Sequence, residues 1–193
     1  MEFHRKRLNE EIPDTLLLVE HKPTITVGKS GNLHNILAES AELRRQGLAL
    51  SFIDRGEGIT YYGPGQIVGY PIVNLKDRGK DIRRFVRDTE EVIISTMQGF
   101  DIQADRHESR PGVWADGREL AAIRLGIKRW ITIHGFAINV TPDLSDCDRI
   151  NPCRFLAHKV TSMSQLLGSA VSVKEVAASL TMNFSQVFDL IQT

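Results

Sequence analysis

Apolar residues recur along this chain mainly in short runs, a pattern typical of β-strands joined by turns. Residues 14–20 form one apolar run and residues 24–27 alternate, which predicts two strands around a turn at Lys22-Pro23. Two more strands are predicted at 48–53 and 66–73. Four short strands follow at 112–115, 119–127, 130–133 and 136–140, separated by Asp-Gly, Lys-Arg and His-Gly pairs. These last four runs indicate a meander.

Helical periodicity is clearest at 81–100, where apolar residues recur at three- and four-residue spacing after Asp81. Residues 2–11 predict the end of a first helix, and Ser40 caps a short predicted helix that ends at Gly47, after a loop at 32–38. Two helices near 162–167 and 173–191 close the chain. We therefore expect an α/β (α+β) fold, a mixed sheet with flanking helices, in one domain spanning residues 1–193.

The stretch 54–75 contains five glycines and two prolines. Glycine lets the backbone approach a ligand closely or adopt positive φ, and Tyr61 and Tyr62 add aromatic surface and hydroxyl groups. A tight hairpin connection explains the same residues as ordinary turn chemistry. The strands predicted on either side place this loop at a sheet edge, and the residues alone leave both interpretations open.

The chain has 24 basic and 24 acidic residues and no net charge, so it carries no general field for nucleic acid or anionic membranes. No apolar run reaches the ~18 residues of a membrane span, and the N-terminus lacks an apolar signal core. We expect a cytoplasmic protein. Arg83, Arg84 and Arg87 form a basic flank of the predicted helix, which suits either solvent or an acidic partner.

The chain has two cysteines, Cys147 and Cys153. Their spacing fits neither a zinc site nor a disulfide framework, so one or both are free thiols. From the residues alone, Cys153 is expected to be a buried structural thiol, because free cysteine is among the most buried residue types.

Three motifs, kept in order, resemble one known family. The first comprises Arg55-Gly56, Thr60-Tyr61 and Gly63-Pro-Gly-Gln66, the second spans residues 112–125, and the third spans residues 130–153 and ends in Ile150-Asn-Pro-Cys153. From about Ile12 to Leu167 the chain resembles the lipoate-biosynthesis octanoyltransferases, also called lipoyl(octanoyl) transferases. The resemblance implies the fold of lipoate and biotin protein ligases. It also implies transfer of an octanoyl group from acyl carrier protein to a lysine of a lipoyl domain.

The implied reaction requires a thiolate that attacks the thioester of the carrier and forms an acyl-enzyme. The resemblance assigns this role to Cys153, whereas Cys147 matches no functional position. The backbone N–H groups of Gly135 and Phe136 are suited to polarising a thioester carbonyl, and His134 suits a structural role as well as a catalytic one. The implied substrate-binding residues are Arg55, Gly56, Glu57, Gly58, Ile59, Thr60, Tyr61, Tyr62, Ala122, Ile123, Arg124, Gly135, Phe136 and Ala137.

The sequence departs from the family at the position of a lysine that lowers the pKa of the cysteine, where this chain has Glu119. A negative charge has the opposite effect and raises the pKa of a nearby cysteine, because it disfavours the thiolate. Tyr62 replaces a histidine, and Glu57, Arg124 and Arg154 each replace a glycine.

We hypothesise that Glu57 and Glu119 pair with Arg124 and Arg154 and fill part of the acyl tunnel. In the alternative, a shifted register at Arg118-Glu119 leaves the tunnel open and turns these side chains to solvent. Because arginine cannot shuttle a proton, His134 or His158 would have to do so.

Two classes of function follow. One is an octanoyltransferase with a cysteine thioester intermediate, and the alternative is a catalytically impaired relative that binds an acyl carrier, a lipoyl domain or a small ligand as a partner or regulator. An ATP-using lipoate ligase ranks below both, because the motifs are those of the transferases. The expected partners are octanoyl-acyl carrier protein and a lipoyl-domain or glycine-cleavage H-type acceptor. We expect a monomer with no cofactor, metal, nucleic acid or membrane span.

Overall fold

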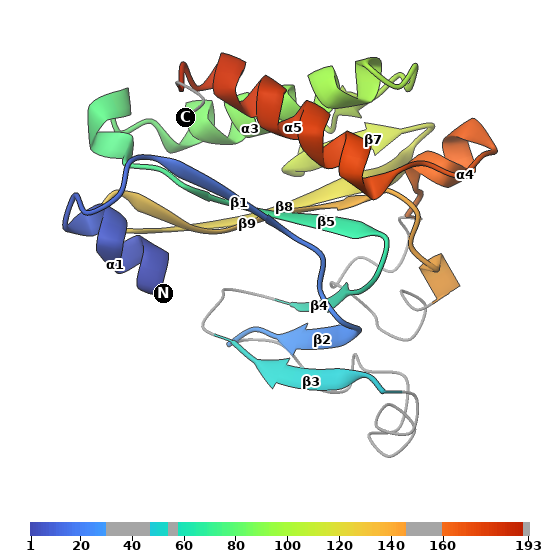
Figure 1. Ribbon diagram of the computed structural model, residues 1–193, viewed down its shortest axis with the longest axis horizontal. Coiled ribbons are helices and arrows are strands. Elements are labelled where there is room, and N and C mark those ends of the chain that lie inside the picture. The colour runs from blue at the N-terminus through green and yellow to red at the C-terminus, as the bar shows by residue number, and fades with distance from the viewer. Residues whose placement is uncertain (30–46, 54–57, 146–159, 191–193) are drawn as a thin grey trace.

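The computed structural model describes residues 1–29, 47–53, 58–145 and 160–190. Among these residues, two sheets and several helices form the architecture of Figure 1. The helical elements are α1 (Glu2–Leu8), η2 (Leu75–Arg78), α3 (Ile82–Gln98), α4 (Met163–Leu167) and α5 (Val173–Val187). The strands are β1 (Thr15–Val19), β2 (Thr24–Val27), β3 (Ala49–Phe52), β4 (Ile59–Tyr62), β5 (Gln66–Ile72), β6 (Asp105–Arg106), β7 (Gly112–Ala115), β8 (Arg118–Lys128) and β9 (Ile131–Asn139).

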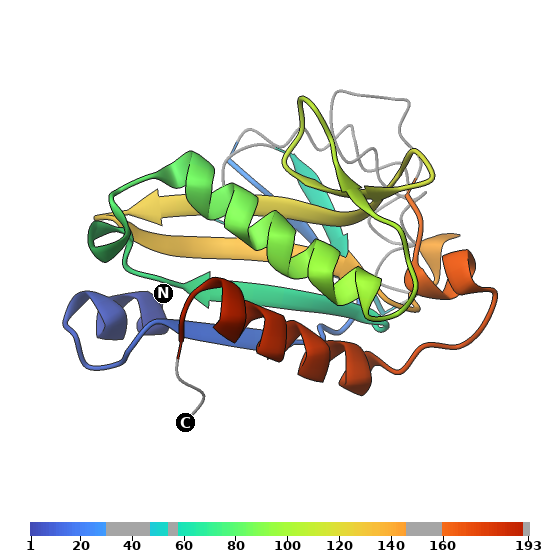
Figure 2. The same ribbon diagram turned by 90° about the horizontal axis from the view of Figure 1, so that it is seen from above.

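The larger sheet has the strand order β1-β5-β9-β8-β7-β6, and each neighbouring pair in it is antiparallel. Helices α3 and α5 lie across one face of this sheet (Figure 2). The smaller sheet has the order β3-β2-β4, with β2 parallel to β3 and antiparallel to β4, and it lies on the other side (Figure 1). The predicted α/β (α+β) class with a mixed sheet and flanking helices is therefore confirmed.

The predicted helix at 81–100 is α3, and it begins where the sequence indicates. The side chain of Asp81 caps it by accepting a hydrogen bond from the backbone N–H of Arg84 at 2.9 Å. The apolar face of α3 packs with α5 against the larger sheet, and Val92, Ile93 and Met97 are fully buried there. Within the described residues, no helix is both long and apolar enough to cross a membrane.

Two tight hairpins set the register of the larger sheet. Asp116 and Gly117 connect β7 to β8, and both have positive φ, as a two-residue type I′ turn requires. Arg129 and Trp130 do the same between β8 and β9, although neither is a residue that favours this conformation. The Asp-Gly turn is thus confirmed, and the following strand begins at Ile131 rather than Trp130.

The predicted break at His134-Gly135 is wrong, because β9 continues through both residues. The ladder with β8 runs unbroken across this point, and His134 keeps its place in it with a positive φ of 62°. Gly135 allows β9 to lie tightly against β5, since a Cβ atom there would overlap the carbonyl oxygen of Gly69. The glycine therefore marks a close approach of two strands and not a turn.

Two other predictions are wrong, one about the strands around Lys22-Pro23 and one about the glycine-rich loop. The strands on either side of Lys22-Pro23 belong to different sheets, because β1 pairs with β5 while β2 pairs with β3 and β4. The stretch predicted to be a loop contains β4, because Ile59 and Tyr61 alternate with polar positions and are buried in the core of the smaller sheet. The predictions for 32–38 and 40–46 lie outside the described residues.

Candidate functional site

A pocket of about 570 Å³ is lined by α1, the smaller sheet and strands of the larger sheet. Its apolar lining includes Leu17 on β1, Val68 and Ile72 on β5, and Ile133 on β9. The polar lining lies mainly on the smaller sheet and the turn before it, at His21, Thr24, Thr26, Ser51 and Tyr62, and α1 and the larger sheet add His4, Tyr70 and His134. The pocket therefore combines an apolar wall with a polar one.

The register of β8 and β9 brings together two of the predicted substrate-binding segments. Ala122 pairs with Ala137, Ile123 with Phe136, and Arg124 with Gly135. Gly135 and Phe136 line the pocket. Ile123 and Phe136 also belong to the core cluster under the helices, so the alternation of the strand directs Ala122 and Arg124 to the opposite face.

The first predicted segment reaches the same pocket through β4. Ile59 and Tyr61 are buried in the core of the smaller sheet, whereas Tyr62 lines the pocket. Gly58 and Thr60 lie on this segment, and the Gly58 carbonyl accepts a hydrogen bond from the N–H of Gly28 at 3.0 Å. Arg55, Gly56 and Glu57 lie outside the described residues. Of the described residues in this segment, Tyr62 is thus the one that lines the pocket.

Glu119 owes its orientation to a β-bulge in β8. Val113 pairs with Ala121 and Trp114 pairs with Glu119, so Leu120 is an extra residue in the ladder. Both Leu120 and Ala121 are buried in the core under the helices. The bulge therefore turns Glu119 to the opposite face of the sheet, the face that Ala122 and Arg124 share.

Glu119 is only 8% exposed, so the alternative that turns this side chain to solvent is wrong at this position. Arg124 is half-buried, and its guanidinium donates to the carbonyl of Ile123 at 3.0 Å. The proposed partners Glu57 and Arg154 and the predicted nucleophile Cys153 lie outside the described residues, as do Cys147 and His158. The described chain resumes at Val160, which forms a bridge with Glu119.

A buried chain of hydrogen bonds connects the three motifs. The Gln66 side chain accepts from the N–H of Gly63 and donates to Asn139 Oδ1, both at 2.9 Å. Asn139 Nδ2 donates to the carbonyl of Thr161 at 3.0 Å, and the Thr161 N–H donates to the carbonyl of Glu119 at 3.0 Å. Gln66 and Asn139 therefore hold the backbone around Glu119 in place.

Asn139→Ala is expected to lower the free energy of unfolding by about 2–3 kcal/mol, because it leaves Gln66 Nε2 and the Thr161 carbonyl buried without this partner. Urea unfolding followed by fluorescence measures the change. Asn183→Ala is a matched control, since Asn183 donates to Thr96, whose hydroxyl keeps its bond to the Val92 carbonyl. Asn183→Ala should lower the free energy of unfolding by less than about 1 kcal/mol. Equal losses in the two variants would show that the buried chain of hydrogen bonds does not stabilise the fold more than a single partly buried bond does.

Sequence reasoning missed His21 and Tyr70, which lie together in the pocket. His21 Nε2 lies 2.8 Å from Tyr70 Oη, and the His21 ring centroid lies 5.6 Å from that of Tyr62. The adjacent Glu20 accepts a hydrogen bond from the Gly65 N–H at 2.6 Å, which links this turn to the glycine-rich stretch. A single histidine after a strand carries no motif, so these contacts had no signal in the sequence.

Burial lowers the pKa of His21 below its ordinary value of 6.5. The unfolded chain then binds more protons than the native protein at pH values just below 6.5, so the free energy of unfolding should fall as pH drops through that region. Chemical unfolding of the wild type and His21→Gln between about pH 7 and pH 5 tests this. The variant should lose part of the pH dependence, and an identical dependence in both proteins would contradict the assignment to His21.

The family model of the lipoyl protein ligase A/B catalytic domain matches residues 1–185. An octanoyltransferase from Desulforamulus reducens is 41% identical over 95% of this chain and 81% of that protein. An octanoyltransferase from Pelobacter propionicus is 42% identical over 92% of this chain and 81% of that protein.

Among solved structures, lipoate-protein ligase A bound with ATP superposes with a TM-score of 0.81 at 14% identity, covering 99% of this chain and 81% of that one. A biotin protein ligase from Aquifex aeolicus superposes with a TM-score of 0.54 at 13% identity, covering 88% and 70%. These likenesses confirm the expected fold. Through the match over residues 1–185 and the relatives above 40% identity, this chain belongs to the family of the lipoyl protein ligase A/B catalytic domain and, within it, to the octanoyltransferases.

Proposed function

We propose that this protein transfers an octanoyl group from acyl carrier protein to a lysine of a lipoyl domain through a thioester on Cys153. The observation that carries the proposal is the direct pairing of residues 122–124 with residues 135–137 beside the pocket of about 570 Å³. Family membership supports the same activity. The acceptor in this proposal is a lipoyl domain or a glycine-cleavage H-type protein.

The pocket suits an acyl chain in size and in lining. Its volume lies within the ~300–1,000 Å³ typical of small-molecule sites. Leu17, Val68, Ile72 and Ile133 offer apolar surface along which an eight-carbon chain loses contact with water. Tyr62 and His21, on the polar wall, suit the thioester end of the substrate better than its hydrocarbon end.

In the proposed reaction, the Cys153 thiolate attacks the carbonyl carbon of the carrier thioester. The carrier sulfur leaves and takes up a proton, which leaves the octanoyl group on Cys153. The lysine amine of the acceptor then attacks this second thioester, forms the amide, gives up a proton and releases the cysteine thiolate.

The predicted polarising role of the Gly135 and Phe136 N–H groups gains no support, because N–H groups in a β-ladder point within the sheet toward neighbouring strands.

A transfer assay with purified proteins tests the proposal. The protein is incubated with octanoyl-acyl carrier protein and a lipoyl domain, and mass spectrometry follows the mass of the lipoyl domain. We expect a gain of one octanoyl group that depends on the acceptor lysine, because replacing that lysine by alanine removes the attacking amine. A lipoyl domain that stays unmodified at high enzyme concentration would overturn the proposal.

A second candidate function is favoured by Glu119, which is buried and for whose position the family resemblance implies a lysine. A carboxylate beside the nucleophile disfavours the thiolate, so the same scaffold would serve to bind an acyl carrier or a lipoyl domain without turnover. In that case Cys153 would resist alkylation by a thiol reagent at neutral pH while the partner still binds. Alkylation at Cys153 that octanoyl-acyl carrier protein blocks would favour the transferase instead.

A further inference from the structure

An open groove of about 740 Å³ lies between α3 and residues 106–111. One wall consists of Ile82, Arg83, Val86 and Arg87 on α3. The other wall begins at Arg106, which is held against the helix by a hydrogen bond from its guanidinium to the Arg87 carbonyl at 3.2 Å. None of the residues that line this groove takes part in the proposed octanoyl transfer.

The groove is lined by more positive than negative side chains, four arginines against Glu90 and Glu108. Glu90 is buried, where it accepts from the Gly112 N–H at 3.1 Å and pairs with Arg106 at 3.2 Å. Arg83 and Arg87 are exposed one helical turn apart, with Ile82 46% exposed beside them. The groove thus presents two exposed cationic side chains and one exposed apolar side chain to a partner.

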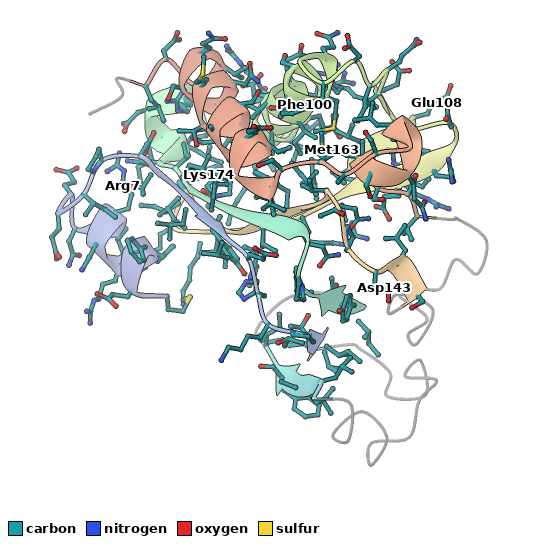
Figure 3. The ribbon with its side chains drawn as sticks, turned by 45° about the vertical axis from the view of Figure 1, so that its right-hand side comes forward. Arg7, Phe100, Glu108, Asp143, Met163 and Lys174 are labelled. Carbon is teal, nitrogen blue, oxygen red and sulfur yellow. The ribbon has the colours of Figure 1, made fainter. Side chains whose placement is uncertain are left out.

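Trp114 packs against two residues of the groove, with its ring centroid 4.7 Å from the His107 ring and 5.9 Å from the Arg110 guanidinium. Trp114 is the residue that pairs with Glu119 across the β7–β8 ladder. In Figure 3, Glu108 lies at the outer end of the connection that forms this wall. A series of contacts therefore runs from the groove through Trp114 to Glu119.

We infer that this groove binds an acidic helical surface of the acyl carrier protein that donates the octanoyl group, and this inference rests on the proposed function. Carboxylates one turn apart on the partner helix would pair with Arg83 and Arg87, and an apolar residue between them would cover Ile82. The chain as a whole has no net charge. A local positive groove therefore selects where an acidic partner docks, since no overall field attracts it elsewhere.

The test compares two donors, octanoyl-acyl carrier protein and the small neutral thioester octanoyl-N-acetylcysteamine. The double variant Arg83→Glu/Arg87→Glu should raise KM for the carrier-bound donor by about tenfold, and this increase in KM should become smaller as salt is added. KM for the small thioester should stay unchanged. Lys174→Glu, a charge reversal at an exposed position of α5, is the matched control and should leave both donors unaffected.

Direct binding separates this inference from the proposed function. Isothermal titration of the protein with octanoyl-acyl carrier protein should give a Kd that rises about tenfold in the double arginine variant and stays constant in Lys174→Glu. A tenfold rise in Kd would support the docking groove even in a protein that transfers no octanoyl group. The absence of transfer would refute only the proposed function. An unchanged Kd in the double variant, or no binding by the wild type, would overturn the docking groove.

Discussion

Replacing Cys153 with alanine is expected to lower the rate of octanoyl transfer by at least about a thousandfold, the scale seen when a covalent nucleophile is removed. Alanine cannot form the second thioester, so transfer would require direct attack of the lysine amine on the carrier thioester. That route lacks the intermediate that divides the reaction into two easier steps. The measurement is the initial rate at which a purified lipoyl domain gains an octanoyl group.

Cys147→Ala is the matched control for this prediction, because it removes the other thiol of the chain. Its transfer rate should equal that of the wild type. A Cys153→Ala variant that retains wild-type activity would exclude the thioester mechanism, and loss of activity in Cys147→Ala alone would place the nucleophile at that residue instead.

Replacing Glu119 with lysine is expected to raise the transfer rate by about tenfold to a hundredfold at pH 7. A free cysteine has a pKa near 8.5, so only a few per cent of it is thiolate at that pH. An ammonium group in place of the carboxylate stabilises the thiolate and adds a group that can exchange protons with the departing thiol and the incoming amine. The β-bulge at Leu120 turns residue 119 to the sheet face opposite the helices, so the new side chain should lie on that face as well.

Glu119→Gln separates the two effects, because it removes the negative charge without supplying a proton donor. We expect its transfer rate at pH 7 to lie between those of the wild type and the lysine variant. The pH at half-maximal rate should shift downward in the order Glu, Gln, Lys. Thermal unfolding of each variant controls for the cost of placing a lysine at a position that is 8% exposed. Equal rates and equal pH profiles in folded proteins of all three kinds would show that residue 119 does not act on the nucleophile.

Local chemistry allowed much of the fold to be predicted. The cap at Asp81, the apolar face of α3 and the Asp116-Gly117 turn each depend on residues close together in the sequence, and each is present. The break at Gly135 was wrong for a reason that involves a distant residue. Only the neighbouring strand β5, with Gly69 at the point of contact, shows that this glycine permits close packing.

Pairing between distant strands explains the other differences. Nothing near Lys22-Pro23 indicates that β1 and β2 join separate sheets, because that choice depends on β5 and β4. The extra residue at Leu120 likewise appears only in the ladder with β7. Without it, a strict alternation would have placed Glu119 on the side of the buried core.

For the candidate site, the sequence motifs identified segments that the fold brings together, whereas hydrogen-bond partners remained hidden. Residues 122–124 and 135–137 were singled out separately and are paired partners in the structure. The contact of His21 with Tyr70 joins residues 49 positions apart and follows no sequence pattern. The roles assigned to Arg55, Glu57, Cys153 and Arg154 remain predictions, since these residues lie outside the described part of the chain.

Intact-protein mass spectrometry after incubation with octanoyl-acyl carrier protein, without an acceptor, tests the thioester on Cys153 most directly. We predict that the wild type gains the mass of one octanoyl group, that hydroxylamine removes it, and that Cys153→Ala gains none. Glu119→Lys should reach the same mass sooner. If neither the wild type nor Glu119→Lys acquires an octanoyl group, Cys153 is not the acyl carrier of a transferase and the protein acts by binding alone.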